Sequence, residues 1–294
     1  MAETRFFFVD VFAEHPLEGN PLAVVPDADH LDETQMRAIA REFNQSETTF
    51  LVHTTGAADW RLRSFTPAGI EVAGAGHNAL GAWMWLADAG RLHPAQERFL
   101  QQIGHEVLNV DVTHGPEQIT VVTMEQSAPV FGPVLTDRAG LAQALGLAES
   151  DLLESPAQVV STGAAHLLVP LDSRAAVDRA NPDAQRLSSI LRTVTDEGCY
   201  VYSHDPVNST GRSIAYTRFF NPTVGIFEDP ATGTAAGPLA ARLARESRLR
   251  SGEVAIVEQG YLLGRPSHIQ VLVENDNVRI SGSGLVVASG TLHL

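Results

Sequence analysis

The chain carries one sequence pattern twice, once in each half. Residues 63–67 lead through a loop that contains two glycines into an alanine-rich segment, and residues 218–222 lead through the loop 229–234 into another. Each copy predicts a strand that ends in proline, a glycine-bearing loop and then a helix start. Such a helix start presents backbone N–H groups that have no partner within the helix, so each copy is a candidate anion-binding end.

A second pair of matching segments, 19–26 and 163–170, precedes the first pair in the same order. A chain of 294 residues also exceeds what one hydrophobic core usually supports. We therefore expect two domains. The N-terminal domain spans residues 1–127 and is joined by a returning strand at about 286–294, and the C-terminal domain spans residues 128–285.

Strands outnumber helices in both halves. Residues 32–43 carry apolar side chains at i, i+3, i+4 and i+7, with Asp32 available as the cap, which predicts one amphipathic helix. Further helices are expected over residues 79–89 and 234–245. The pattern predicts an α/β (α+β) chain of two similar domains, each a mixed rolled sheet around a central helix, rather than a doubly wound parallel sheet.

Charge and hydropathy exclude several kinds of partner. The net charge is −15, from 20 Lys and Arg against 35 Asp and Glu, which argues against a nucleic-acid surface and against a polybasic membrane face. No apolar run approaches the ~18 residues of a membrane span, and the first ten residues do not resemble a signal peptide. We expect a cytoplasmic protein that acts on a small molecule.

The residues that bind cofactors and metals in common motifs are missing. The single cysteine, Cys199, excludes an intrachain disulfide and a cysteine-based metal cluster. The loop 74–79 satisfies a relaxed dinucleotide fingerprint, but residues 66–69 separate it from the preceding strand and the alternation of a nucleotide-binding fold is absent. We expect neither a cofactor nor a metal.

Three polar residues lie close to the ends of predicted helices. His77 precedes the helix expected at 79–89, where the positive end of the helix favours a neutral imidazole or a hydrogen-bond donor, although His77 could equally bond the loop backbone. Asp229 occupies the comparable place in the second copy and could instead be a helix cap. Glu47 follows the helix expected at 32–43 and stands at the start of a predicted strand. A carboxylate there is often solvated, but one held in an apolar cleft can take and give a proton near neutrality.

Five segments in order resemble the phenazine-biosynthesis PhzF-like isomerases, which have the diaminopimelate-epimerase fold. They cover nearly the whole chain and are residues 19–25, 44–50, 65–67 with 71–72 and 76–77, 228–235 and 259–267. The resemblance implies two similar domains that both contribute to one active site. It also suggests a homodimer.

The same resemblance implies cofactor-free proton-shift chemistry on a small cyclic carboxylic acid like trans-2,3-dihydro-3-hydroxyanthranilate. Glu47 would move the proton between carbons, with His77 and Asp229 as its polar partners in the catalytic set. The implied substrate-binding residues are Gly76, Asn78, Gly233 and Thr234, with the backbone of the two glycines and Thr234 holding the substrate carboxylate.

The chain departs from related patterns at a few positions. Sister epimerases and proline racemases use paired cysteines, but Ala75 stands before Gly76 where a cysteine often occurs, and Cys199 matches neither position. A two-thiol racemase is therefore excluded. Thr234 replaces a serine, and Asn78 stands where proline or alanine is usual. A silent binding protein for small acids and a lyase or dehydratase that uses the same base remain alternatives.

Overall fold

The computed structural model describes residues 3–72, 74–115, 119–195, 197–209 and 211–294. Contacts between Cα atoms group the chain into two compact units. Unit 1 comprises residues 1–125 and 281–294, and unit 2 comprises residues 126–280. Among the described residues, no helix is both long and apolar enough to cross a membrane.

Unit 1 contains a mixed sheet to which the C-terminal strand returns. Its strands are β1 (Glu3–Val11), β2 (Asn20–Val25), β3 (Thr48–Val52), β4 (Trp60–Phe65), β5 (Glu71–Val72), β6 (Arg98–Ile103), β7 (Glu106–His114), β8 (Thr120–Gln126) and β18 (Gly284–His293). The pairing order is β18, β1, β2, β3, β4, β6, β7, β8, with β2–β3 and β4–β6 parallel and the other pairs antiparallel. The short strand β5 adds to β4. Residues 116–118, which stand between β7 and β8 in the sequence, lie outside the described residues.

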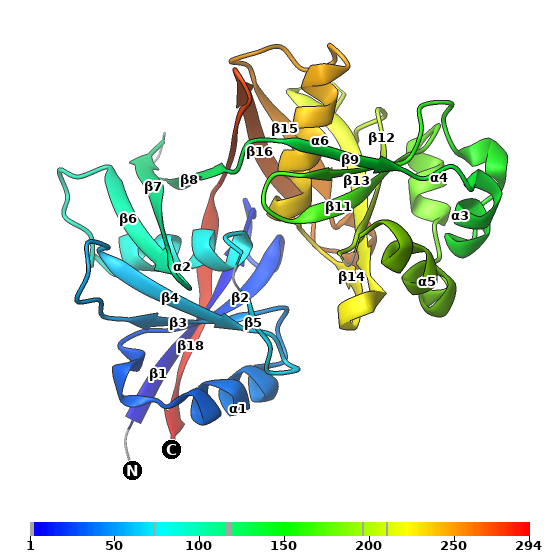
Figure 1. The fold of residues 1–294 in the computed structure, drawn as a ribbon. Coiled ribbons are helices and arrows are strands. Elements are labelled where there is room, and N and C mark those ends of the chain that lie inside the picture. Colours follow the sequence, from blue (N-terminus) through cyan, green and yellow to red (C-terminus); the bar gives the residue numbers. More distant parts are fainter. Residues whose placement is uncertain (1–2, 73, 116–118, 196, 210) are drawn as a thin grey trace. The chain divides into compact units, whose positions relative to one another are not determined.

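Two helices pack on this sheet. α1 (Glu33–Phe43) has Asp32 as its cap in a full capping box and buries Met36, Ile39 and Ala40, as the periodicity predicted. These side chains join Phe50 and others in a cluster against β3 and β4. α2 (His77–Asp88), cyan in Figure 1, contacts β1, β2, β3, β4 and β18 and is buried over nearly its whole length. A helix that is apolar all round belongs inside a rolled sheet, which is where α2 lies.

Unit 2 repeats this plan. Its strands are β9 (Val130–Val134), β10 (Gln158–Ser161), β11 (Ala165–Pro170), β12 (Cys199–Ser203), β13 (Ser213–Asn221), β14 (Ile226–Asp229), β15 (Val254–Gln259), β16 (Ser267–Glu274) and β17 (Asn277–Gly282), the last of which crosses the boundary at residue 280. The pairing order β9, β10, β11, β12, β13, β15, β16 has β11–β12 and β13–β15 parallel and the rest antiparallel. The short strand β14 adds to β13.

The helices of unit 2 are α3 (Arg138–Ala144), α4 (Arg174–Arg179), α5 (Ala184–Val194) and α6 (Gly233–Arg245). α6 is the counterpart of α2 and contacts β10, β11 and β16 (Figure 1). The three other helices contribute to a second buried cluster, to which Leu141, Val177, Leu187 and Leu191 belong. The helix α4 was not predicted. The short 3₁₀ helices are η1 (Ala28–His30), η3 (Glu149–Asp151), η4 (Pro222–Val224) and η5 (Tyr261–Leu263).

The predicted fold class, two similar domains with a mixed sheet around a central helix, is confirmed by these pairings. From β1 to β7 and from β10 to β16 the pairs alternate in the same way, and each half adds one short strand before its central helix. Gly81 and Gly237 occupy the fifth position of α2 and α6. A Cβ atom on Gly81 would lie 2.6 Å from the Leu22 side chain, and one on Gly237 would overlap Gln126. Gly81 lets α2 approach β1 and β2, and Gly237 leaves room beside α6 for the side chain of Gln126.

Both central helices begin slightly earlier than the sequence indicated. α2 starts at His77 rather than Ala79, and α6 starts at Gly233 rather than Thr234. The cause is that the carbonyl group of Gly76 accepts from the N–H groups of the third and fourth residues after it, so the helical pattern includes His77. The catalytic candidate His77 is thus fixed in the first turn of α2 rather than in a loop.

Candidate active site

In unit 1 the structure brings Glu47 and His77 together. Nε2 of His77 lies 3.0 Å from Oε2 of Glu47, and the two side chains are 9% and 16% exposed. The two residues are thirty positions apart in the sequence, and their contact arises because Glu47 directly precedes β3 and His77 begins α2. The pair is therefore partly shielded from water without being sealed in the core.

Each member of this pair is placed by regular structure. α1 ends at Asn44, whose left-handed conformation (φ 51°) turns the chain toward β3, and Glu47 lies immediately before that strand. His77 is the first residue of α2, which β3 contacts. Because the first turn of a helix fixes the backbone of His77, the direction of its Cα–Cβ bond is defined.

At 3.0 Å the carboxylate and the imidazole lie at ion-pair distance, although neither of the two facing atoms makes a hydrogen bond in this structure. A carboxylate with a neighbouring imidazole can thus remove a proton from a bound molecule and return it, while the histidine stabilises the charge that forms.

Asn78 organises the loop in front of α2. Its Oδ1 accepts the N–H of Gly76 at 2.7 Å, and its Nδ2 donates to Oγ of Ser64 and to the carbonyl oxygen of Gly74, both at 3.1 Å. The side chain is buried. Two of the predicted substrate-binding residues, Gly76 and Asn78, therefore bind each other in this structure.

In unit 2 the second loop brings Asp229, Gly233 and Thr234 close in sequence and space. Asp229 is buried and ends β14, and its Oδ2 accepts the hydroxyl of Thr232 at 2.5 Å. The N-cap residue of α6 is Thr232, three residues after Asp229. Gly233 and Thr234 are the first two residues of α6, so their N–H groups belong to the set that the helix itself does not satisfy.

A buried histidine that sequence reasoning assigned no role contacts this loop. Nε2 of His166, on β11, lies 3.2 Å from Oγ1 of Thr234, and the ring packs edge-on against Phe219 at 5.1 Å between centroids. Burial lowers the pKa of His166 to about 3, so the imidazole is neutral at physiological pH. The one signal in the sequence was a histidine inside the apolar strand of the repeated segment 163–170.

Cys199 lies on β12 and is buried, and burial raises the pKa of its thiol to about 12. A thiol in such surroundings stays protonated and is a poor nucleophile and base.

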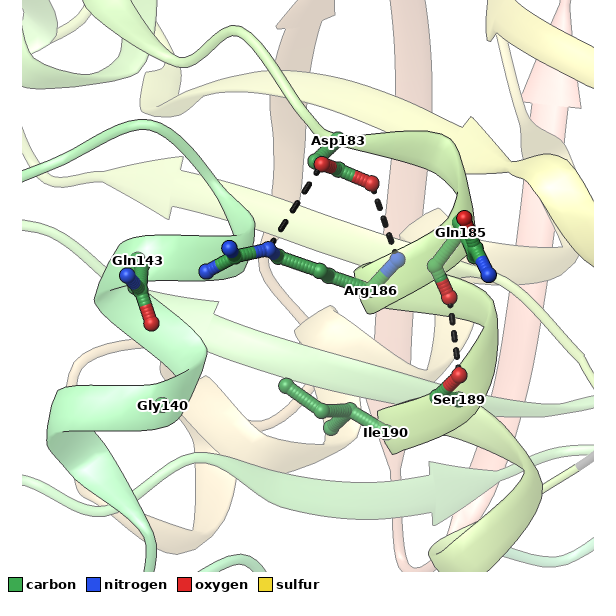
Figure 2. A pocket seen from close by; sticks show the side chains of 7 residues that line it. All are labelled: Gly140, Gln143, Asp183, Gln185, Arg186, Ser189 and Ile190. Atoms are coloured by element: carbon green, nitrogen blue, oxygen red, sulfur yellow. Dashed lines mark hydrogen bonds and ion pairs between the residues drawn. The ribbon is translucent and has the colours of Figure 1, made fainter.

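Figure 2 shows a concave surface between α3 and α5 that none of the predicted site residues lines. The residues around it are Gly140, Gln143, Asp183, Gln185, Arg186, Ser189 and Ile190. Their polar groups serve the helices: Asp183 caps α5 by accepting from the N–H of Arg186 at 2.9 Å, and the Ser189 hydroxyl donates to the carbonyl oxygen of Gln185 at 2.9 Å. This surface offers no acid–base pair comparable to Glu47 and His77.

Comparisons with known proteins agree on one kind of protein. A model of the family described as "Phenazine biosynthesis-like protein" matches residues 9–290. The trans-2,3-dihydro-3-hydroxyanthranilate isomerase of Pseudomonas chlororaphis is 35% identical over 297 residues, which cover 99% of each chain. A phenazine biosynthesis protein of the PhzF family from Bacillus anthracis has a crystal structure that matches with a TM-score of 0.92, at 27% identity and complete coverage of both chains.

The fold extends to more distant enzymes. A hydroxyproline epimerase from Agrobacterium vitis matches with a TM-score of 0.66 at 11% identity, covering 99% of this chain and 91% of its own, which shows the fold alone. The relatives show an isomerase, and the structural comparisons show the diaminopimelate-epimerase-like fold. Within that class, the chain belongs to the PhzF-like phenazine biosynthesis family.

Proposed function

We propose that this isomerase catalyses a cofactor-independent proton shift on a small cyclic carboxylic acid like trans-2,3-dihydro-3-hydroxyanthranilate, with Glu47 as the acid and base. The observation that carries the proposal is the 3.0 Å contact between the Glu47 carboxylate and the His77 imidazole. The substrate class is supported by the name of the relative that is 35% identical.

In the proposed reaction, Glu47 removes a proton from one carbon of the substrate and delivers it to another. His77 lies at ion-pair distance from the carboxylate and stabilises its changing charge. The N–H groups of Gly233 and Thr234, at the positive end of α6, are suited to bind the substrate carboxylate, and Asp229 supplies a second polar partner. A general acid–base step of this type contributes roughly 10²–10⁴ in rate, and orientation and electrostatics supply the rest.

The Gly76 N–H already donates to Asn78. We propose that Asn78 contributes to substrate binding by shaping this loop, and that the Gly76 N–H reaches a ligand only when the Asn78 side chain releases it. We also propose that the enzyme works as a cytoplasmic homodimer. Light scattering and cell fractionation test these two properties directly.

The decisive experiment compares the wild-type enzyme with Glu47→Gln in deuterated water, with trans-2,3-dihydro-3-hydroxyanthranilate as substrate. The wild type is expected to give an isomer of unchanged elemental composition, with deuterium at the new C–H position to the extent that the proton on Glu47 exchanges with solvent before it is delivered. Glu47→Gln should lose at least about 10²-fold in kcat, because an amide cannot accept the proton. Glu42→Gln, an exposed glutamate at the end of α1, is the matched control and should keep wild-type kcat.

Other outcomes would replace this proposal. Loss of water from the product would identify a lyase, and ligand-induced stabilisation with neither an isomerised product nor deuterium uptake would identify a binding protein. Full activity in Glu47→Gln would show that another group is the base.

A further inference from the structure

The segment 259–267 belongs to the family pattern but supplies none of the predicted site residues. Its first residue, Gln259, is the last residue of β15 and is completely buried. A buried amide is costly unless its hydrogen-bonding groups are satisfied, so its partners reveal what it does.

Gln259 binds the turn that carries Asp229. Its Nε2 donates to the carbonyl oxygen of Asp229 at 2.7 Å and to Oγ1 of Thr232 at 3.1 Å. Its Oε1 accepts the N–H of Thr232 at 3.1 Å and the hydroxyl of Tyr200 at 2.9 Å. All four hydrogen-bonding positions of the amide are thus filled.

These contacts fix the orientation of the amide. A backbone N–H can only donate and a backbone carbonyl can only accept, so Oε1 must face the Thr232 N–H and Nε2 must face the Asp229 carbonyl. Burial raises the pKa of Tyr200, which keeps its phenol protonated and able to donate to Oε1.

The order of donors and acceptors that Gln259 sets extends through the Thr232 hydroxyl to the Asp229 carboxyl group. Because the Thr232 oxygen accepts from Nε2 of Gln259, its own single proton is directed to Oδ2 of Asp229, 2.5 Å away. This hydrogen bond fixes Oδ2 of Asp229 as the acceptor of the Thr232 hydroxyl and thereby orients the carboxyl group.

The residues after Gln259 hold the same turn from its other side. Gly260 has φ of 83°, and a Cβ atom there would lie 2.6 Å from the carbonyl oxygen of Pro230. The hydroxyl of Ser267 lies 3.2 Å from that carbonyl oxygen. Only a glycine fits this close to the Asp229–Thr232 turn. Gln259, Gly260 and Ser267 therefore all contact or closely approach the same turn.

We propose that Gln259 is a positioning residue which, through Thr232, fixes the orientation of the Asp229 carboxyl group by directing the Thr232 hydroxyl proton to Oδ2. This inference rests on the proposed role of Asp229 in the reaction. Gln259 does not touch the substrate, and its contribution reaches the chemistry through the Thr232 hydroxyl.

The kinetic test uses trans-2,3-dihydro-3-hydroxyanthranilate and two substitutions of Thr232. Thr232→Val removes the hydroxyl at nearly constant shape and should lower kcat about tenfold or more with KM changed less than about threefold, the size expected for one charge-assisted hydrogen bond. Thr232→Ser keeps the hydroxyl and should stay within about threefold of wild type. Thr195→Val, which loses a hydroxyl bonded to the carbonyl oxygen of Ala165 at 2.6 Å, is the control for a lost threonine hydrogen bond and should keep wild-type kcat.

Gln259→Glu tests the order of donors and acceptors between residue 259, Thr232 and Asp229, because the side chain keeps its size. A carboxylate cannot donate to Thr232, so the Thr232 proton would turn toward residue 259 and leave Oδ2 of Asp229 without it. This variant is expected to match Thr232→Val in kcat. Wild-type kcat in either variant would overturn the proposal.

A spectroscopic measurement on the wild type needs neither a substrate nor a folded variant. A hydroxyl that donates across 2.5 Å in a buried site should give a slowly exchanging, downfield proton resonance, assigned by selective threonine labelling. It should persist in the wild type even if Glu47 proves not to be the base, which separates failure of this inference from failure of the proposed function. A Thr232 hydroxyl proton that exchanges freely with water would overturn the positioning role.

Discussion

Replacing His166 by glutamine should remove a large part of the acid sensitivity of the fold. His166 is 2% exposed, and burial lowers its pKa from 6.5 to about 3. The folded protein therefore keeps this imidazole neutral over a pH range in which the unfolded chain binds a proton. The stabilisation is fully present above about pH 6.5 and is lost as the pH falls toward 3.

The size of the effect follows from the separation of the two pKa values. Each pH unit below 6.5 favours the unfolded chain by ~1.4 kcal/mol for this one group. Between pH 7.5 and pH 5.0 the contribution of His166 to the free energy of unfolding should fall by about 2 kcal/mol. Glutamine keeps a polar atom near Thr234 but does not titrate, so it lacks this dependence.

The assay is urea unfolding at both pH values for the wild type, His166→Gln and the exposed-site control His105→Gln. The difference in unfolding free energy between the two pH values should be smaller by about 2 kcal/mol in His166→Gln, whereas the control should follow the wild type. The comparison between pH values cancels any constant cost of the substitution. Equal pH dependence in wild type and His166→Gln would refute the argument that burial holds this histidine neutral.

Three further substitutions test other contacts. Arg218→Met should destabilise unit 2 by about 3–5 kcal/mol in urea unfolding, because it leaves the Glu228 carboxylate buried without its partner. In the structure the guanidinium lies 2.8 Å from this carboxylate, and the Glu228 side chain is 6% exposed. The double variant Arg218→Met with Glu228→Leu should be less destabilised than Arg218→Met alone, and an equal or larger loss would contradict this reasoning. Asn78→Ala should cost about 1–3 kcal/mol by leaving the buried N–H of Gly76 unpaired, and unchanged stability would show that the loop repairs itself. Gly260→Ala should lower the melting temperature markedly, because the alanine Cβ would overlap two carbonyl oxygens at a φ that alanine rarely adopts. A melting temperature within about 1–2 °C of the wild-type value would contradict the close approach of Gly260 to these oxygens.

The duplication and the amphipathic pattern of α1 made the fold class predictable. Hydrophobic spacing and caps act within a few residues, so Met36, Ile39 and Ala40 could be assigned to a buried helical face from their spacing alone. Helix starts were less well predicted. The two extra residues at the start of α2 and the one at the start of α6 depend on a carbonyl group that accepts from the first turn, and that bond is not visible in composition or periodicity.

The site was predictable only in part. Glu47 and His77 were singled out separately, Glu47 from its place before a strand and both through family resemblance, but no spacing rule indicated their 3.0 Å contact. The His166–Thr234 contact and the Gln259 network were not predicted. Each joins residues from different strands and loops, and a buried polar side chain has no sequence periodicity of its own.

The sequence by itself determined the doubled architecture, the absence of a second cysteine and the acidic character of the chain, because these follow from residue types and short-range order. The tertiary structure decided which polar groups meet. Strand pairing brings Gln259 and Tyr200 to the Asp229 turn, and burial then decides how their protons are arranged, since a group removed from water must take its hydrogen bonds from whatever the fold places beside it.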